Sequence, residues 1–119
     1  MKRNRVLILA VVVIAFLAIG GYLVSRNVGG GGRAVAIDLT VSGTTITPAH
    51  PAVKQGDRVT MTITADKMEE IHLHGYDIPF QVPSAGGSVT HAFTADKSGS
   101  FEMEIEASAQ HLTFFTVNP

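Results

Sequence analysis

The sequence contains no cysteine, and that single absence excludes several kinds of chemistry. No disulfide can form, no thiolate can act as a nucleophile, and no thiolate can bind a metal ion. A Gly-x-Ser-x-Gly nucleophile motif is absent as well. The 119 residues leave room for one domain. That domain must be held together by its apolar core alone, which a chain of this size can manage.

Positive charge is scarce in residues 34–119. This range holds four Lys or Arg residues and all ten Asp and Glu residues of the chain, which gives a formal charge of −6. The value of −1 for the whole chain hides this imbalance. An acidic surface repels phosphate backbones and concentrates cations. We therefore expect no nucleic-acid partner and consider metal ions instead.

Residues 6–24 form an apolar stretch without a charged or strongly polar side chain. As a helix it would be about 28 Å long, close to the roughly 30 Å hydrocarbon core of a bilayer. Lys2, Arg3 and Arg5 precede it, so the positive-inside rule places residues 1–5 in the cytoplasm. We expect a single-pass signal anchor that exports the remainder to the periplasm or the extracellular space. A cleaved signal peptide is the alternative, but the sequence offers only poor processing sites.

A run of four glycines at 29–32 follows the apolar stretch and is typical of a flexible tether. We therefore divide the chain into a cytoplasmic N-terminus (1–5), a transmembrane anchor (6–24), a linker (25–33) and a folded domain (34–119).

Short alternating patterns fill the predicted domain, and no amphipathic helical pattern follows residue 33. In residues 101–106, for example, apolar side chains alternate with glutamates, which predicts a strand with one buried face and one solvated acidic face. About seven such strands, separated by turn signals, predict an all-β fold, most simply a two-sheet sandwich.

Two histidines, His72 and His74, lie two residues apart in a segment that favours a strand. Side chains at this spacing point to the same face. With a rise of about 3.3 Å per residue, their α-carbons lie roughly 6.6 Å apart, so both imidazoles can converge on one ion. The alternative is that Glu70, His72 and His74 simply form the wet face of a half-buried strand.

The order of motifs resembles the cupredoxin superfamily. The resemblance rests on H-L-H-G-Y-D at 72–77, F-T-A-D-K-S-G-S-F-E-M-E-I at 93–105 and the closing V-N-P. It is greatest to the small membrane-anchored bacterial cupredoxin-like proteins with an H-x-H-G-Y-D segment, and it covers most of residues 34–119. It implies a Greek-key sandwich with a copper site. It also implies that the loop after residue 105 lies at the same end of the sandwich as the histidine pair.

The expected ligand set departs from that of the blue-copper members, which use two histidines, a cysteine and a methionine. Ile105 stands about where the cysteine would lie, and Glu106 stands where His-x-His relatives commonly have a histidine. His111 or Glu106 could supply the third ligand. The predicted metal ligands are therefore His72, His74, His111 and Glu106.

We expect a membrane-anchored module that binds copper, or another late first-row metal, without acting as a blue-copper electron carrier. A metal-free structural or interaction domain with an eroded copper site is the alternative. An enzyme of the cupin kind is disfavoured, because its pattern needs a glutamate shortly after the second histidine and this chain offers only Asp77. The second half of that pattern is only echoed by Pro83, Gly86 and His91.

Overall fold

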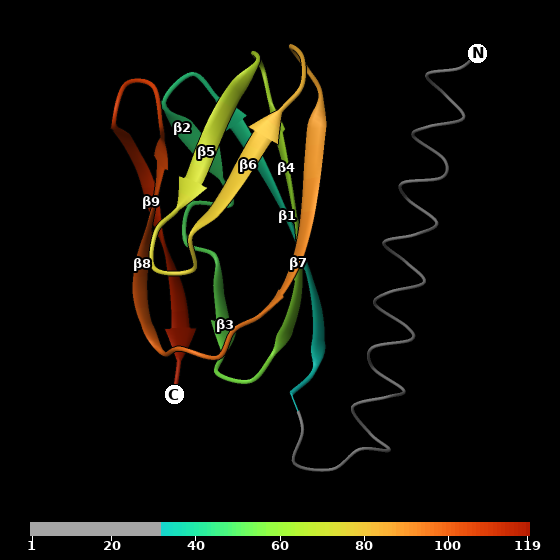
Figure 1. Cartoon of the computed structure of the whole chain (residues 1–119), viewed down its shortest axis with the longest axis vertical. Helices are drawn as coiled ribbons and strands as arrows, with labels where there is room; N and C mark the ends of the chain where they lie inside the picture. The colour runs from blue at the N-terminus through green and yellow to red at the C-terminus, as the bar shows by residue number, and fades with distance from the viewer. Residues whose placement is uncertain (1–31) are drawn as a thin grey trace, which may run out of the picture.

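Two β-sheets pack face to face in residues 32–119, which are the residues that the computed structural model describes (Figure 1). The predicted cytoplasmic N-terminus, the predicted anchor and residues 25–31 of the predicted linker lie outside this range. Within the described range, no helix has the length and hydropathy that crossing a membrane requires.

The four-stranded sheet has the order β2-β1-β4-β7. Its strands are β1 (Ala34–Ser42), β2 (Thr45–Thr47), β4 (Arg58–Ala65) and β7 (Ser88–Thr94). β1 pairs with β4 in parallel, and the other two pairings are antiparallel.

The five-stranded sheet has the order β3-β9-β8-β5-β6. Its strands are β3 (Ala52–Lys54), β5 (Glu69–Leu73), β6 (Ile78–Val82), β8 (Gly99–Ile105) and β9 (Gln110–Asn118). The all-β sandwich predicted from the alternating patterns is confirmed. The strands β2 and β3 are three residues each, too short to show an alternation that sequence analysis could detect.

The core lies between the two sheets and is built from every second residue of the longer strands. Its largest fully buried side chains are Phe80, Phe115, Leu39, Met61, Ile63, Ile71, Leu73 and Met103. Burying one side chain of this size contributes about 1.5–3 kcal/mol relative to leaving it exposed. Because the period of a strand is two, burial of Ile71, Leu73 and Met103 fixes which neighbouring side chains face outward.

Asp57, in the turn before β4, ties the beginning of the domain to the sandwich. Its buried carboxylate accepts hydrogen bonds from the backbone N–H groups of Lys54 and Arg33. The backbone N–H of Arg58 in turn donates to the Arg33 carbonyl over 2.7 Å. The packed contacts of the sandwich therefore begin before β1.

Candidate metal centre

The outer face of the five-stranded sheet carries a cluster of histidines and carboxylates contributed mainly by β5 and β8. These antiparallel strands pair His72 with Glu104, between the buried pairs Ile71–Ile105 and Leu73–Met103. Because the apolar pairs point into the core, the histidine and glutamate side chains must point away from it. The acidic face predicted for residues 101–106 is thus confirmed, but it adjoins histidines rather than only solvent.

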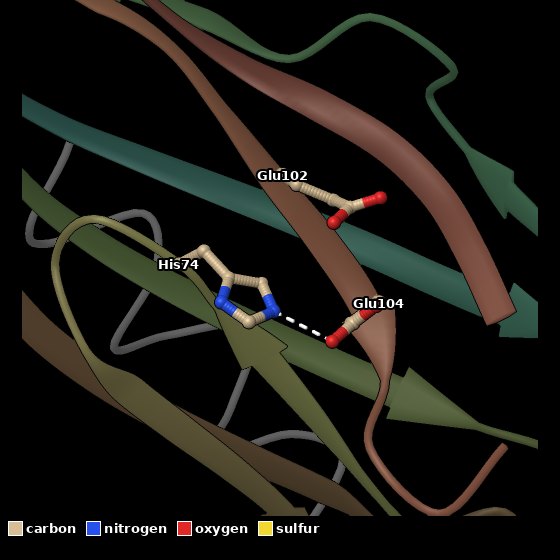
Figure 2. A group of neighbouring side chains, drawn as sticks. All are labelled: His74, Glu102 and Glu104. Atoms are coloured by element: carbon tan, nitrogen blue, oxygen red, sulfur yellow. Dashed lines mark hydrogen bonds and ion pairs between the residues drawn. The ribbon is translucent and has the colours of Figure 1, made fainter. Parts of the chain in front are cut away.

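His74 follows the last residue of β5 and faces two glutamates of β8, as Figure 2 shows. Its backbone N–H donates to the Glu102 carbonyl over 2.9 Å, which holds the residue beside β8. Its Nε2 atom lies 2.6 Å from Glu104 Oε1. One ligand atom from each of His74, Glu102 and Glu104 lies within 4.8 Å of the others. These three residues form the candidate metal centre.

His72 lies next to His74 but contacts different carboxylates. The two imidazole rings have centroids 4.4 Å apart and meet edge to face. His72 Nε2 lies 3.0 Å from Asp77 Oδ1, and its Nδ1 lies 3.7 Å from Glu106 Oε2. The predicted pair therefore shares one face, as expected, but His72 is not among the three residues of the candidate centre.

A β-bulge brings the third histidine to the same face. The pairing of β8 with β9 shifts between Met103 and Glu104, so that Met103 lies opposite Thr113 but Glu104 lies opposite His111. The extra residue, Leu112, packs against the core. A bulge of this kind re-aims side chains. As a result His111 Nδ1 lies 2.8 Å from Glu102 Oε2.

The four predicted ligands occupy the same sheet face but adjoin different partners. Glu106 lies beside His72, and His111 lies beside Glu102. The expectation that the two loops share one end of the sandwich is wrong. Because β5 and β8 run antiparallel, the turn after β5 and the loop after β8 lie at opposite ends of this strand pair (Figure 1).

Two members of the cluster, Glu102 and Glu104, were not predicted as ligands. The alternation of β8 predicts that both face outward, but an outward row of glutamates is typical of ordinary solvated surface. The missing information was the pairing of β8 with β5, which only the tertiary structure supplies.

The turn after β5 is fixed by contacts that account for the rest of the H-G-Y-D segment. Gly75 adopts φ 84°, and a β-carbon there would lie 2.2 Å from Phe101 Cδ1. The Tyr76 hydroxyl donates to the Lys97 carbonyl over 2.7 Å and accepts from the Lys97 N–H over 3.0 Å. Burial raises the pKa of the Tyr76 hydroxyl, which favours the protonated form that donates this hydrogen bond. The turn is therefore anchored to the β7–β8 connection, and this anchoring sets the position of Asp77.

The ligand atoms of the candidate metal centre are one imidazole nitrogen and two carboxylate oxygens. Such ligands suit Cu(II) and Zn(II), whereas Cu(I) prefers sulfur. The His74 Nε2–H donates its hydrogen bond to the Glu104 carboxylate, so an ion bound at this nitrogen must displace a proton.

Solved structures of copper proteins have a similar strand arrangement. The metal-binding domain of the Cu(I)-exporting P-type ATPase CopA from Streptococcus pneumoniae D39, crystallised with Cu(I), matches with a TM-score of 0.59 at 17% identity. The match covers 76% of this chain and 89% of that one. A copper binding protein solved by NMR in its apo form matches with a TM-score of 0.55 at 14% identity, over 75% of this chain and 90% of that one.

The laccase from Botrytis aclada matches with a TM-score of 0.57 at 17% identity, over 79% of this chain but only 24% of the laccase. At these identities the likeness establishes the fold, a sandwich that resembles cupredoxin-like domains. No family model matches the sequence, and no curated protein matches it significantly.

Proposed function

We propose that the domain binds copper(II), or another late first-row cation, on the outer face of its five-stranded sheet. The observation that carries this proposal is the convergence of His74, Glu102 and Glu104, whose ligand atoms lie within 4.8 Å of one another. His74 directly follows β5, and both glutamates lie in β8, the strand paired with β5, so the sandwich holds the three side chains close together before any ion arrives.

The chemistry of the donors supports this assignment. Copper(II) heads the affinity order of divalent first-row metals for nitrogen and oxygen sites. The formal charge of −6 on residues 34–119 favours the approach of cations. The similar solved structures include a domain crystallised with Cu(I) and a copper binding protein, which is consistent with a metal-related role.

The cellular setting is also a proposal. The apolar stretch 6–24 would anchor the chain in the membrane, and the acidic domain would lie in the periplasm or the extracellular space. We assign no enzymatic activity to the domain, and without a cysteine it would not act as a blue-copper electron carrier.

A metal-free structural or interaction domain is the second candidate, and one observation favours it. His72, His74 and His111 each already have a carboxylate oxygen within 3.0 Å, at Asp77, Glu104 and Glu102 respectively. Such histidine–carboxylate pairs could persist as surface ion pairs of small energetic value.

The deciding experiment is metal analysis of the full-length chain, purified in a mild detergent and dialysed against Cu(II) or Zn(II). We expect at least one equivalent to remain bound. His74→Ala and Glu104→Gln should each lower the affinity at the candidate centre by tenfold or more. His50→Ala is the matched control, because His50 is exposed in the connection between β2 and β3. If no ion is retained, the metal-free candidate is correct.

A further inference from the structure

The side chain of His72 has one ring nitrogen, Nδ1, for which residues 32–119 supply no hydrogen-bond partner. This atom is buried from solvent. The nearest carboxylate oxygen, Glu106 Oε2, lies 3.7 Å away, beyond hydrogen-bonding distance. A buried polar atom without a partner is costly, and an ion is one of the standard reasons for its presence.

Asp77 contacts the other nitrogen of this imidazole. Its carboxylate can only accept, so the His72 Nε2–H donates the hydrogen bond of 3.0 Å. In the neutral ring this leaves Nδ1 with a free lone pair. The arrangement matches the carboxylate–histidine–metal triads in which a second carboxylate fixes the tautomer of a ligand.

The distance between Nδ1 and Glu106 Oε2 also suits a shared ion. With metal–ligand bonds of about 2.0–2.2 Å, two ligands of one ion lie about 3–4 Å apart. The observed 3.7 Å falls in this range.

We propose a second cation position between His72 Nδ1 and Glu106 Oε2, with Asp77 as the positioning residue that holds the imidazole. This inference rests on the proposed function and extends it to a pair of neighbouring ions, because the His72 and His74 rings lie only 4.4 Å apart. The charge balance is suitable. The four carboxylates that contact these two histidines or belong to the candidate centre match two divalent ions: Asp77, Glu102, Glu104 and Glu106.

The test is a titration of the detergent-purified full-length chain with Cu(II), followed by calorimetry and electron paramagnetic resonance. We expect two equivalents to bind. Saturation of the second position should reduce the resonance signal per copper, because neighbouring Cu(II) spins interact. His50→Ala should still bind two.

Variants separate the two positions. His72→Ala and Glu106→Gln should each bind a single equivalent with an undiminished signal, whereas His74→Ala should lose the other equivalent. Asp77→Gly should weaken the second equivalent by about tenfold or more while leaving the first unchanged. Glycine is the suitable replacement because Asp77 adopts φ 54°, a conformation that alanine would strain.

The possible results distinguish this inference from the proposed function. One equivalent that is lost in His74→Ala but unaffected by Glu106→Gln would disprove the second position and leave the proposed function intact. No retained copper would refute both. Two equivalents that survive combined replacement of His72 and His74 by alanine would place the ions elsewhere. Glu106 is about half exposed, so Glu106→Gln should fold and decides the matter if His72→Ala does not.

Discussion

His74 Nε2 lies 2.6 Å from Glu104 Oε1, although the strand register places His72 opposite Glu104. The contact is therefore diagonal across the β5–β8 pair. His111 repeats this offset, since it lies opposite Glu104 but bonds Glu102. Diagonal neighbours in a sheet are within reach of long side chains. The offset brings the His74 imidazole, rather than that of His72, into the group formed by Glu102 and Glu104.

Copper-loaded protein should show no intense blue absorption. That band requires charge transfer from a cysteine thiolate to Cu(II), and the chain has no cysteine. With imidazole and carboxylate ligands, only weak visible absorption is expected. A visible spectrum of the protein with one equivalent of Cu(II) provides the measurement. An intense thiolate band from the single chain would contradict the sequence itself.

Glu69→Gln should stabilise the domain at neutral pH and have little effect in acid. Burial raises the pKa of Glu69, the positive charge of Lys67 opposes this rise, and Asp66 adds to it. A carboxyl whose pKa is raised in the folded state does not lower the free energy of unfolding while the pH is below its unfolded pKa. As the pH rises through the folded pKa, deprotonation of the buried carboxyl lowers that free energy.

Urea unfolding of parent and variant at neutral and at acidic pH measures the difference in unfolding free energy. The glutamine variant should be the more stable one only at the higher pH. An equal difference at both pH values would show that deprotonation of Glu69 carries no cost.

The strands with clear alternation were predictable from sequence, and β8 is the plainest example. Phe101, Met103 and Ile105 mark the inward face of β8 so plainly that the outward glutamates follow. The partner of that strand does not follow, because register depends on contacts distant in the sequence. The bulge that brings His111 rather than Leu112 opposite Glu104 is likewise a tertiary feature. The candidate centre was therefore only partly predictable.

Gly75→Ala should destabilise the domain more than Gly86→Ala. Both glycines have positive φ, 84° and 77°, which costs a residue with a β-carbon about 1–2 kcal/mol. At Gly75 the new carbon would also lie 2.2 Å from the Phe101 ring, whereas nothing lies within 4 Å at Gly86. For Gly75→Ala we expect the free energy of unfolding to fall by roughly 2–4 kcal/mol, because a packing clash adds to the backbone strain. Chemical denaturation of both variants tests this, and equal losses would mean that Phe101 moves aside without cost.

The full-length protein should remain in the membrane fraction with its C-terminal domain outside. Residues 6–24 are long enough to span, and the residues after them offer no good cleavage site. Protease treatment of intact cells or spheroplasts, followed by detection of a C-terminal tag, reports the orientation. A soluble mature protein whose N-terminus lies anywhere after Gly20 would show that the segment is a cleaved signal peptide.

Copper should raise the thermal stability of the domain through the candidate centre. An ion that binds only the folded state adds about 2.7 kcal/mol at a free concentration one hundred times the dissociation constant. His74→Ala should abolish most of this gain while changing the stability of the metal-free protein little, because the His74 side chain is 42% exposed. Acid should also reduce the gain, since protonated imidazole cannot bind an ion. Thermal unfolding with Cu(II) or with a chelator measures the shift. A shift of equal size in the parent and in His74→Ala would place the ion outside the candidate centre.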